Sequence, residues 1–315
     1  MPGFTTHYLF GVDAYRHLAS TQIRKNLKQN HSAFALGLQG PDLFFYYLPS
    51  YLMHTTNIGA LAHTTDTGVF FSNLLDSRRF FLEKKRSLAI ADSYITGFIG
   101  HYTLDCAIHP YVYAFTGYTP DNPPSNLQYF GQHAYFETEI DTALLYRKKR
   151  ILPSHFHQSA TIHLTPLQRK VIIQMLVYAY QNTYPDIVAS EVLLGGAPLW
   201  MKLGTRLLRD PSGQKKVLAR LIEKLLLGKA FLSPMLASDY YRFIDDPLNL
   251  KHRTWIHPWT HERSTASFDD LYQKAQRHYC KRIAAYYHLL YNGCEGTEKK
   301  AFLKEYGNRS FLSGL

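Results

Sequence analysis

Apolar residues recur at the spacing of an α-helix over much of this chain, and this periodicity constrains the fold more than any other feature of the sequence. Side chains three or four positions apart share one face of a helix, whereas a strand needs an alternating pattern, which is scarce here. Breaks at Gly40-Pro41, Pro153 and Pro185 separate the periodic stretches. The sequence therefore predicts an all-α bundle, with helices over residues 8–18, 58–75, 88–108, 133–146, 166–180, 217–227 and 268–291.

The length of 315 residues allows one large domain or two ordinary ones. Polar residues suited to chemistry concentrate before residue 142, and the stretch 150–164 is the best candidate for a join. We expect a helical domain over residues 1–150. Residues 151–315 would add further helices that pack on it, either as an extension or as part of the same domain.

The charge balance favours anionic partners. The chain has 35 Lys and Arg against 24 Asp and Glu, for a formal net charge of +11. An anionic membrane surface fits this excess, and nucleic acid is an alternative without specific support, because the basic residues lie in short runs. The pattern does not identify a partner, and the oligomeric state is not predictable from it.

The three cysteines have no CxxC spacing, which argues against a disulfide framework or a zinc ribbon. The first residues lack the pattern of a secretory signal, and no apolar run has the length of a membrane span. We therefore expect a soluble cytoplasmic protein without a transmembrane segment.

The most informative polar pattern is His101-x3-Asp105-x3-His109. Successive steps of four residues turn a helix by only about 40°, so the three side chains project along one stripe. Imidazole and carboxylate are ligands that zinc accepts. The stripe predicts a metal site, although three unrelated buried or surface residues would give the same spacing.

A second stripe follows the proline-rich loop near residue 120. His133 and Glu137 repeat the spacing of four residues, and Asp141 extends it. Alone, this pair is equally typical of a solvated helix face. Asp42, His63 and His7 are additional candidates, and each of them could instead be structural.

The order of these residues resembles the zinc-dependent phospholipase C family, which is related to the S1/P1-type zinc nucleases. The resemblance covers about residues 1 to 145, and its most specific parts are the segments around His101-Tyr102-x2-Asp105 and His133-x2-Phe136-Glu137. It implies the multi-helix bundle of that family, with additional helices after it.

The resemblance also implies a ligand set. Asp42, His63, His101 and Asp105 would surround one zinc ion, and His109, His133 and Glu137 would hold a second. A third zinc would use Asp105 and His7; in secreted members the terminal amine and a first-residue tryptophan complete that site, and this chain begins Met1-Pro2. We therefore expect two zinc ions, with a third as an open alternative.

The implied activity is phosphoester hydrolysis, most specifically of a phospholipid or another small phosphodiester, by a hydroxide that bridges two zinc ions. Asp42 is the residue expected to orient or deprotonate the attacking water. Asp141, Asp66 and nearby tyrosines are expected to support the metal-bound imidazoles. A nuclease acting on single strands and a zinc-stabilised helical binding protein without turnover are the alternatives.

Overall fold

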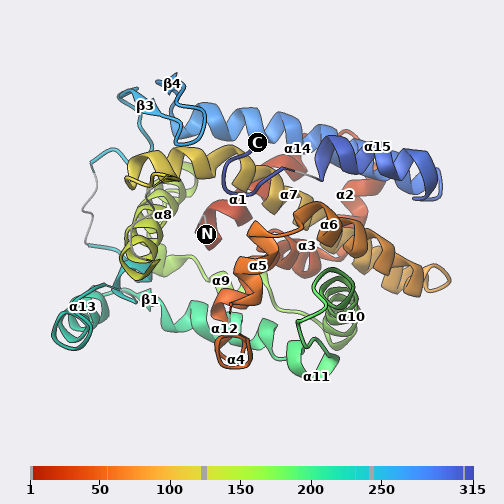
Figure 1. Ribbon diagram of the computed structural model, residues 1–315, viewed down its shortest axis with the longest axis horizontal. Helices are drawn as coiled ribbons and strands as arrows, with labels where there is room; N and C mark the ends of the chain where they lie inside the picture. The colour runs from red at the N-terminus through yellow and green to blue at the C-terminus, as the bar shows by residue number, and fades with distance from the viewer. Residues whose placement is uncertain (1–2, 55, 122–125, 231, 241–244, 308) are drawn as a thin grey trace.

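Helices make up nearly all the regular structure, which confirms the predicted all-α fold (Figure 1). The computed structural model describes residues 3–54, 56–121, 126–230, 232–240, 245–307 and 309–315. The helices are α1 (Phe4–His17), α2 (Thr21–Gln29), α3 (His31–Gly37), α4 (Leu48–Met53), α5 (Ile58–Thr64), α6 (Thr67–Asp76), α7 (Lys85–Phe115), α8 (Asn126–Lys149), α9 (Gln158–Thr161), α10 (Pro166–Thr183), α11 (Glu191–Leu194), α12 (Ala197–Leu207), α13 (Gln214–Leu226), α14 (Phe268–Tyr291) and α15 (Gly296–Tyr306).

Short 3-10 helices and strands join these elements. The 3-10 helices are η1 (Gly40–Tyr46), η2 (Ser77–Phe81), η3 (Pro153–His155) and η4 (Ser233–Met235). Strand β1 (Arg209–Asp210) pairs in parallel with β2 (Ala237–Ser238), and β3 (Trp255–Ile256) pairs antiparallel with β4 (Arg263–Ser264).

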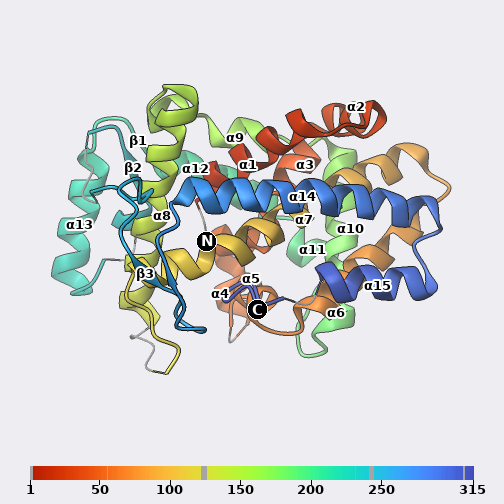
Figure 2. The same cartoon turned by 90° about the horizontal axis from the view of Figure 1, so that it is seen from above.

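Helix α7 lies at the centre of the bundle, packed by α3, α10 and α14 (Figure 2). It is apolar or buried around most of its circumference from Ile90 onward, as expected of a helix enclosed by others. Pro110 lies within it and lacks the N–H that would bond Cys106, yet the helix continues to Phe115. The position of α7 places its polar residues inside the protein, away from water.

Helices from both predicted regions share one core. The hydroxyl of Tyr180, on α10, donates to the carbonyl of Ile58 at 3.1 Å, and the hydroxyl of Tyr279, on α14, donates to the carbonyl of Thr96 at 2.8 Å. All of these groups are buried. The division near residue 150 stays a prediction.

The predicted single helix over residues 58–75 is wrong, because the chain forms α5 and α6 instead. Thr65 is extended and Asp66 has a positive φ of 49°, so the helical hydrogen-bond pattern stops between them. The periodicity also gave no indication of α2, α3, α4, α9, α11, α12 and α15. Among the described residues, no helix combines the length and apolar character needed to cross a membrane.

Candidate metal centre

The stripe predicted on α7 lies in the interior. His101 and Asp105 have no exposed surface and His109 is 2% exposed. Asp105 Oδ2 lies 3.2 Å from His101 Nε2 and 4.0 Å from His109 Nδ1. The spacing of four residues thus places all three side chains on one buried face, with Asp105 in the middle.

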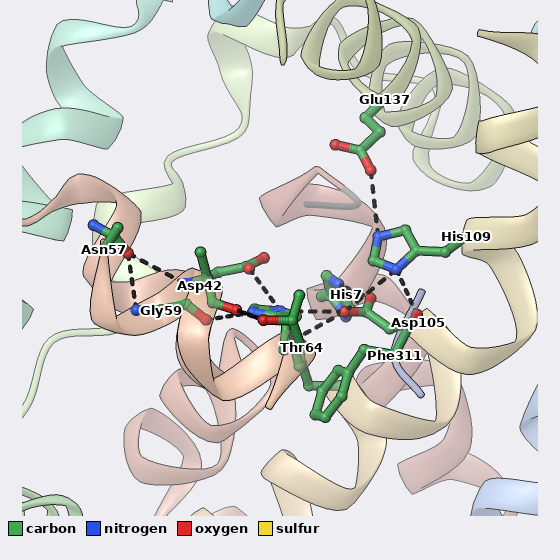
Figure 3. A network of polar contacts seen from close by, with 12 residues as sticks. His7, Asp42, Asn57, Gly59, Thr64, Asp105, His109, Glu137 and Phe311 are labelled. Carbon is green, nitrogen blue, oxygen red and sulfur yellow. Dashed lines mark hydrogen bonds and ion pairs between the residues drawn. The ribbon is translucent and has the colours of Figure 1, made fainter. Parts of the chain in front are cut away.

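Helix α8 brings the second predicted pair to one end of this stripe. His133 Nε2 lies 2.7 Å from Glu137 Oε1, and His109 Nε2 lies 3.8 Å from the same oxygen. In Figure 3, His109 lies between Glu137 and Asp105. His109, His133 and Glu137 therefore form one group with converging ligand atoms.

Three other elements supply the remaining predicted residues. His7 on α1 places Nε2 3.2 Å from Asp105 Oδ1. His63 on α5 places Nε2 3.3 Å from Asp42 Oδ1, on η1, and 3.5 Å from Asp105 Oδ2. The structure thus brings together all eight residues predicted as metal ligands, in three groups: Asp42, His63 and His101; His7, His101 and Asp105; and His109, His133 and Glu137.

The turn that carries Asp42 needs a glycine at position 40. Gly40 has a φ of +50°, and a Cβ added there would lie 2.3 Å from Cδ2 of His101. Both the backbone conformation and the close approach of the ring exclude larger residues. The Gly-Pro-Asp sequence therefore sets Asp42 against His101.

The orientation of three imidazoles is fixed by backbone carbonyls. Nδ1 of His63 bonds the carbonyl of Gly59 at 2.7 Å, Nδ1 of His101 bonds Leu38 at 3.3 Å, and Nδ1 of His109 bonds Phe311 at 2.7 Å. A carbonyl can only accept, so each Nδ1 carries the proton. Each Nε2 is then left to face the centre, which is the usual arrangement of a metal-binding histidine.

Without a bound cation, this arrangement places several hydrogen-bond acceptors next to one another. His63 Nε2 and His101 Nε2 are 3.2 Å apart, and the carboxylates of Asp42 and Asp105 adjoin them. Burial disfavours a charged imidazole, but contacts with Asp105 and Asp42 raise the pKa of His63 to about 9. In the metal-free protein His63 is therefore protonated at pH 7, and its positive charge offsets the charges of the two carboxylates.

The other titratable groups show the same competition between burial and charge. Burial raises the pKa of Asp105, but electrostatic and hydrogen-bond interactions with the imidazoles of His101, His109 and His63 outweigh it and hold that pKa well below its usual range. Burial raises the pKa of Glu137 to about 8 and lowers the pKa of His109 to about 4. Glu137 is thus mainly protonated, and His109 neutral, at pH 7 in the absence of metal.

Unsatisfied atoms show that these residues fit a metal. Both nitrogens of His7, Oδ1 of Asp42, both oxygens of Asp105 and Nε2 of His109 are buried and make no hydrogen bond within the described part of the chain. Leaving buried polar atoms unpaired costs free energy, which a bound cation would remove. The mixture of imidazole and carboxylate suits zinc.

The predicted supporting residues have other roles. Asp141 accepts hydrogen bonds from the backbone N–H groups of Thr5 at 3.0 Å and Thr6 at 2.8 Å, so it caps α1 and thereby positions His7. Asp66 is exposed at the start of α6. The imidazole partners described above are backbone carbonyls instead.

No pattern in the sequence indicates that the C-terminal segment reaches this site. Besides binding His109 through its carbonyl, Phe311 is 2% exposed and packs its ring 4.9 Å from the rings of His63 and Tyr102. A Cβ added to Gly314 would lie 2.2 Å from the carbonyl oxygen of Cys106, so this segment fits closely against α7. It closes one side of the centre.

A cavity of about 80 Å³ adjoins the other side. Asp42 and Glu137 line it, together with Tyr46, Thr205 and Arg209. Burial and the charge of Asp42 raise the pKa of Tyr46, so its hydroxyl stays protonated. A small ligand entering here meets two carboxylates of the centre.

The fold and this cluster define a class of protein, an all-α bundle that encloses a histidine and carboxylate centre suited to zinc. A family model described as zinc dependent phospholipase C matches residues 6–193, which is more than half of the chain. The chain belongs to the zinc-dependent phospholipase C family. No curated protein and no solved structure was found to match it. The family and the cluster together support a zinc-dependent hydrolase.

Proposed function

We propose that this protein is a zinc-dependent phosphodiesterase that acts on a phospholipid or a similar phosphodiester. The observation that carries the proposal is the convergence of eight buried ligand residues beside a cavity, within a chain of this family. Asp42, His63 and His101 would hold one zinc ion, with Asp105 beside them, and His109, His133 and Glu137 would hold a second. His7 and Asp105 are candidates for a third, which we expect to be less complete than the other two.

Zinc, when bound, supplies a Lewis acid that lowers the pKa of water and offsets charge on phosphoryl oxygens. The chain's own groups would orient the reactants. The pKa of Asp42 is lowered, because the charges of His101 and His63 outweigh the effect of burial. Its carboxylate is therefore ionised at neutral pH and can orient a water in the cavity or accept its proton.

Tyr46 would assist from the same cavity. Its hydroxyl remains protonated at neutral pH and can donate a hydrogen bond to an oxygen of the substrate. Phe311 excludes water from the opposite side of the centre. These placements predict that the substrate approaches along the wall formed by Asp42, Tyr46 and Glu137.

The test is hydrolysis of a soluble phosphodiester, bis(4-nitrophenyl) phosphate, by protein stripped with a chelator and then returned to zinc. We expect activity to vanish on stripping and to return with zinc, in parallel with zinc bound per chain. His133→Ala should lose zinc and activity together, whereas His288→Ala, at an exposed position on α14, should lose neither.

Three outcomes separate the alternatives. Zinc binding without turnover of this compound, of phosphatidylcholine or of a single-stranded oligonucleotide would support the binding protein instead. Cleavage of the oligonucleotide alone would support the nuclease. Turnover that survives complete removal of metal would contradict the proposal.

A further inference from the structure

Helix α13 exposes its apolar side and buries its polar side. Its two buried residues are Lys216 and Glu223, which lie seven positions apart on one stripe. The opposite stripe is apolar and at least 46% exposed at every position, namely Val217, Leu218, Leu221, Ile222, Leu225 and Leu226. A surface helix normally turns this stripe toward the core.

Specific bonds fix α13 in this orientation. Lys216 donates from Nζ to the carbonyl of Leu236 at 3.1 Å. The carboxylate of Glu223 accepts hydrogen bonds from the backbone N–H of Ser233 at 3.0 Å and from its hydroxyl at 2.6 Å. Rotating the helix to bury its leucines would break these buried interactions. The apolar face is thus held outward.

Helix α12 adds to the exposed apolar surface. Leu199, Trp200, Leu203 and Leu207 are each at least 39% exposed. Figure 1 shows α12 and α13 along the same lower edge of the molecule. An exposed apolar area of this kind marks a site for a partner or a membrane.

Helix α12 also connects this surface to the metal centre. Thr205, on its buried side, lines the cavity that Asp42 and Glu137 share, and Arg209, two positions after the end of the helix, lines it as well. A wider pocket bounded by Lys202, Arg206 and Arg209 adjoins the same wall. Whatever covers α12 therefore lies next to the entrance of the candidate site.

The charges on these helices favour an anionic partner. Lys215, Arg220 and Lys224 are exposed on α13, and Arg206 is exposed on α12. The only acidic residue on either helix is Glu223, which is turned inward. Lys215 also donates from Nζ to the carbonyl of Arg209 at 2.9 Å, and Arg206 donates to the hydroxyl of Ser159 at 3.3 Å. Leucines flanked by exposed cations are typical of helices that lie in the interface of an anionic bilayer. A second copy of the same face would instead oppose like charges.

We propose that the outer faces of α12 and α13 form a docking surface for an anionic lipid bilayer. The exposed leucines and Trp200 enter the headgroup region, and the flanking lysines and arginines contact acidic lipid. Docking in this orientation brings the cavity beside Asp42 close to the headgroups. The binding itself does not depend on the proposed hydrolysis.

The test is co-sedimentation of the full zinc-loaded chain with vesicles. We expect binding to vesicles of phosphatidylcholine mixed with phosphatidylserine, and weaker binding to phosphatidylcholine alone. The double variant Leu221→Asp, Leu225→Asp should lose more than about tenfold in affinity, because charged side chains would enter the apolar layer. The matched control is Leu82→Asp, at an exposed leucine after η2, which should bind as the wild type does.

A second pair of variants tests the charge. Lys224→Gln should weaken binding to the anionic vesicles by about fivefold, the effect of one cation near such a surface. Lys28→Gln, on α2, which lies away from α13 in both views (Figures 1 and 2), should leave it unchanged. Circular dichroism and zinc content confirm that each variant is folded.

The outcomes distinguish this proposal from the catalytic one. Asp42→Asn should bind vesicles as the wild type does, so vesicle binding without turnover would leave docking standing while hydrolysis failed. The docking proposal would be overturned if the wild type did not bind the anionic vesicles, or if the double aspartate variant bound them as the wild type does. If the wild type is a dimer, the double aspartate variant is a monomer and neither binds vesicles, the face is instead an interface between two copies of the chain.

Discussion

Asp105 and Glu137 are 0% and 2% exposed in the metal centre, whereas Leu225 and Leu226 are 75% and 77% exposed on α13. The centre buries ionisable groups and α13 exposes apolar groups, and each arrangement costs free energy in water. At the centre, carbonyls fix three of the imidazoles in one orientation, as binding a small ion requires. On α13 the inner side is fixed by hydrogen bonds, and the outer side is an exposed apolar stripe, which suits a fluid partner such as lipid.

The largest effect should come from the centre, at Asp42. Asp42→Asn keeps the volume but cannot carry a charge or accept a proton, so we expect phosphodiester hydrolysis to fall by about 10² to 10⁴-fold. Turnover of bis(4-nitrophenyl) phosphate, measured beside zinc content, separates loss of the base from loss of metal. Asp66→Asn is the exposed control and should retain full activity; equal rates for all three proteins would remove Asp42 from the mechanism.

Phe311→Ala should produce the next effect, because it removes a buried ring from the closed side of the centre. We expect the free energy of unfolding to fall by about 3 kcal/mol, the lower end for truncating a buried phenylalanine. Urea unfolding of the zinc-free protein measures it. Leu315→Ala, at a side chain that is 63% exposed, should change stability little. A Phe311→Ala protein as stable as the wild type would show that the C-terminal segment does not pack on the centre in solution.

Zinc binding should release protons. His63 and Glu137 have pKa values of about 9 and about 8 in the metal-free protein, so both are mainly protonated at pH 7 and must lose a proton to bind zinc. The apparent affinity should therefore rise by at least about tenfold from pH 6 to pH 7, and it should level off above pH 9. Calorimetry in buffers of different ionisation enthalpy counts the protons. Affinity that is independent of pH over this range would contradict the assigned protonation states.

The smallest effect should come from α13. Leu225→Ser should change the free energy of unfolding by less than about 0.5 kcal/mol in the absence of lipid, because the side chain is already in water. Thermal unfolding of Leu225→Ser, measured beside that of Phe311→Ala, tests whether only the buried side chain contributes to stability. A loss of several kcal/mol would show that the leucine packs against protein, and the comparison between the two regions would fail.

Helical geometry converts spacing into position, so the sequence could place the ligand-type residues of each helix on one face. His101, Asp105 and His109 had to share a face once α7 formed, and His133 and Glu137 likewise on α8. Placing these two stripes together required the resemblance to a known family, since spacing within one helix carries no information about the next. Phe311 could not be anticipated, because its contact with His109 joins positions that are 202 residues apart.

The orientation of α13 illustrates the opposite case. The periodicity over residues 217–227 correctly predicted an amphipathic helix, and the ordinary assumption is that its leucines face the core. Only the bonds of Lys216 and Glu223 to residues near η4 show which side is buried. The sequence pattern determines that a helix has two faces, but tertiary contacts determine which one meets water.

The most direct test of the zinc centre is anomalous diffraction from crystals of the zinc-loaded protein, with data collected on both sides of the zinc absorption edge. We expect at least two peaks, one bounded by Asp42, His63 and His101 and one by His109, His133 and Glu137, with ligand atoms about 2.0 to 2.3 Å from the metal. Each peak should vanish in data collected below the edge. Crystals that hold zinc elsewhere, while these side chains show no peak between them, would contradict the central claim.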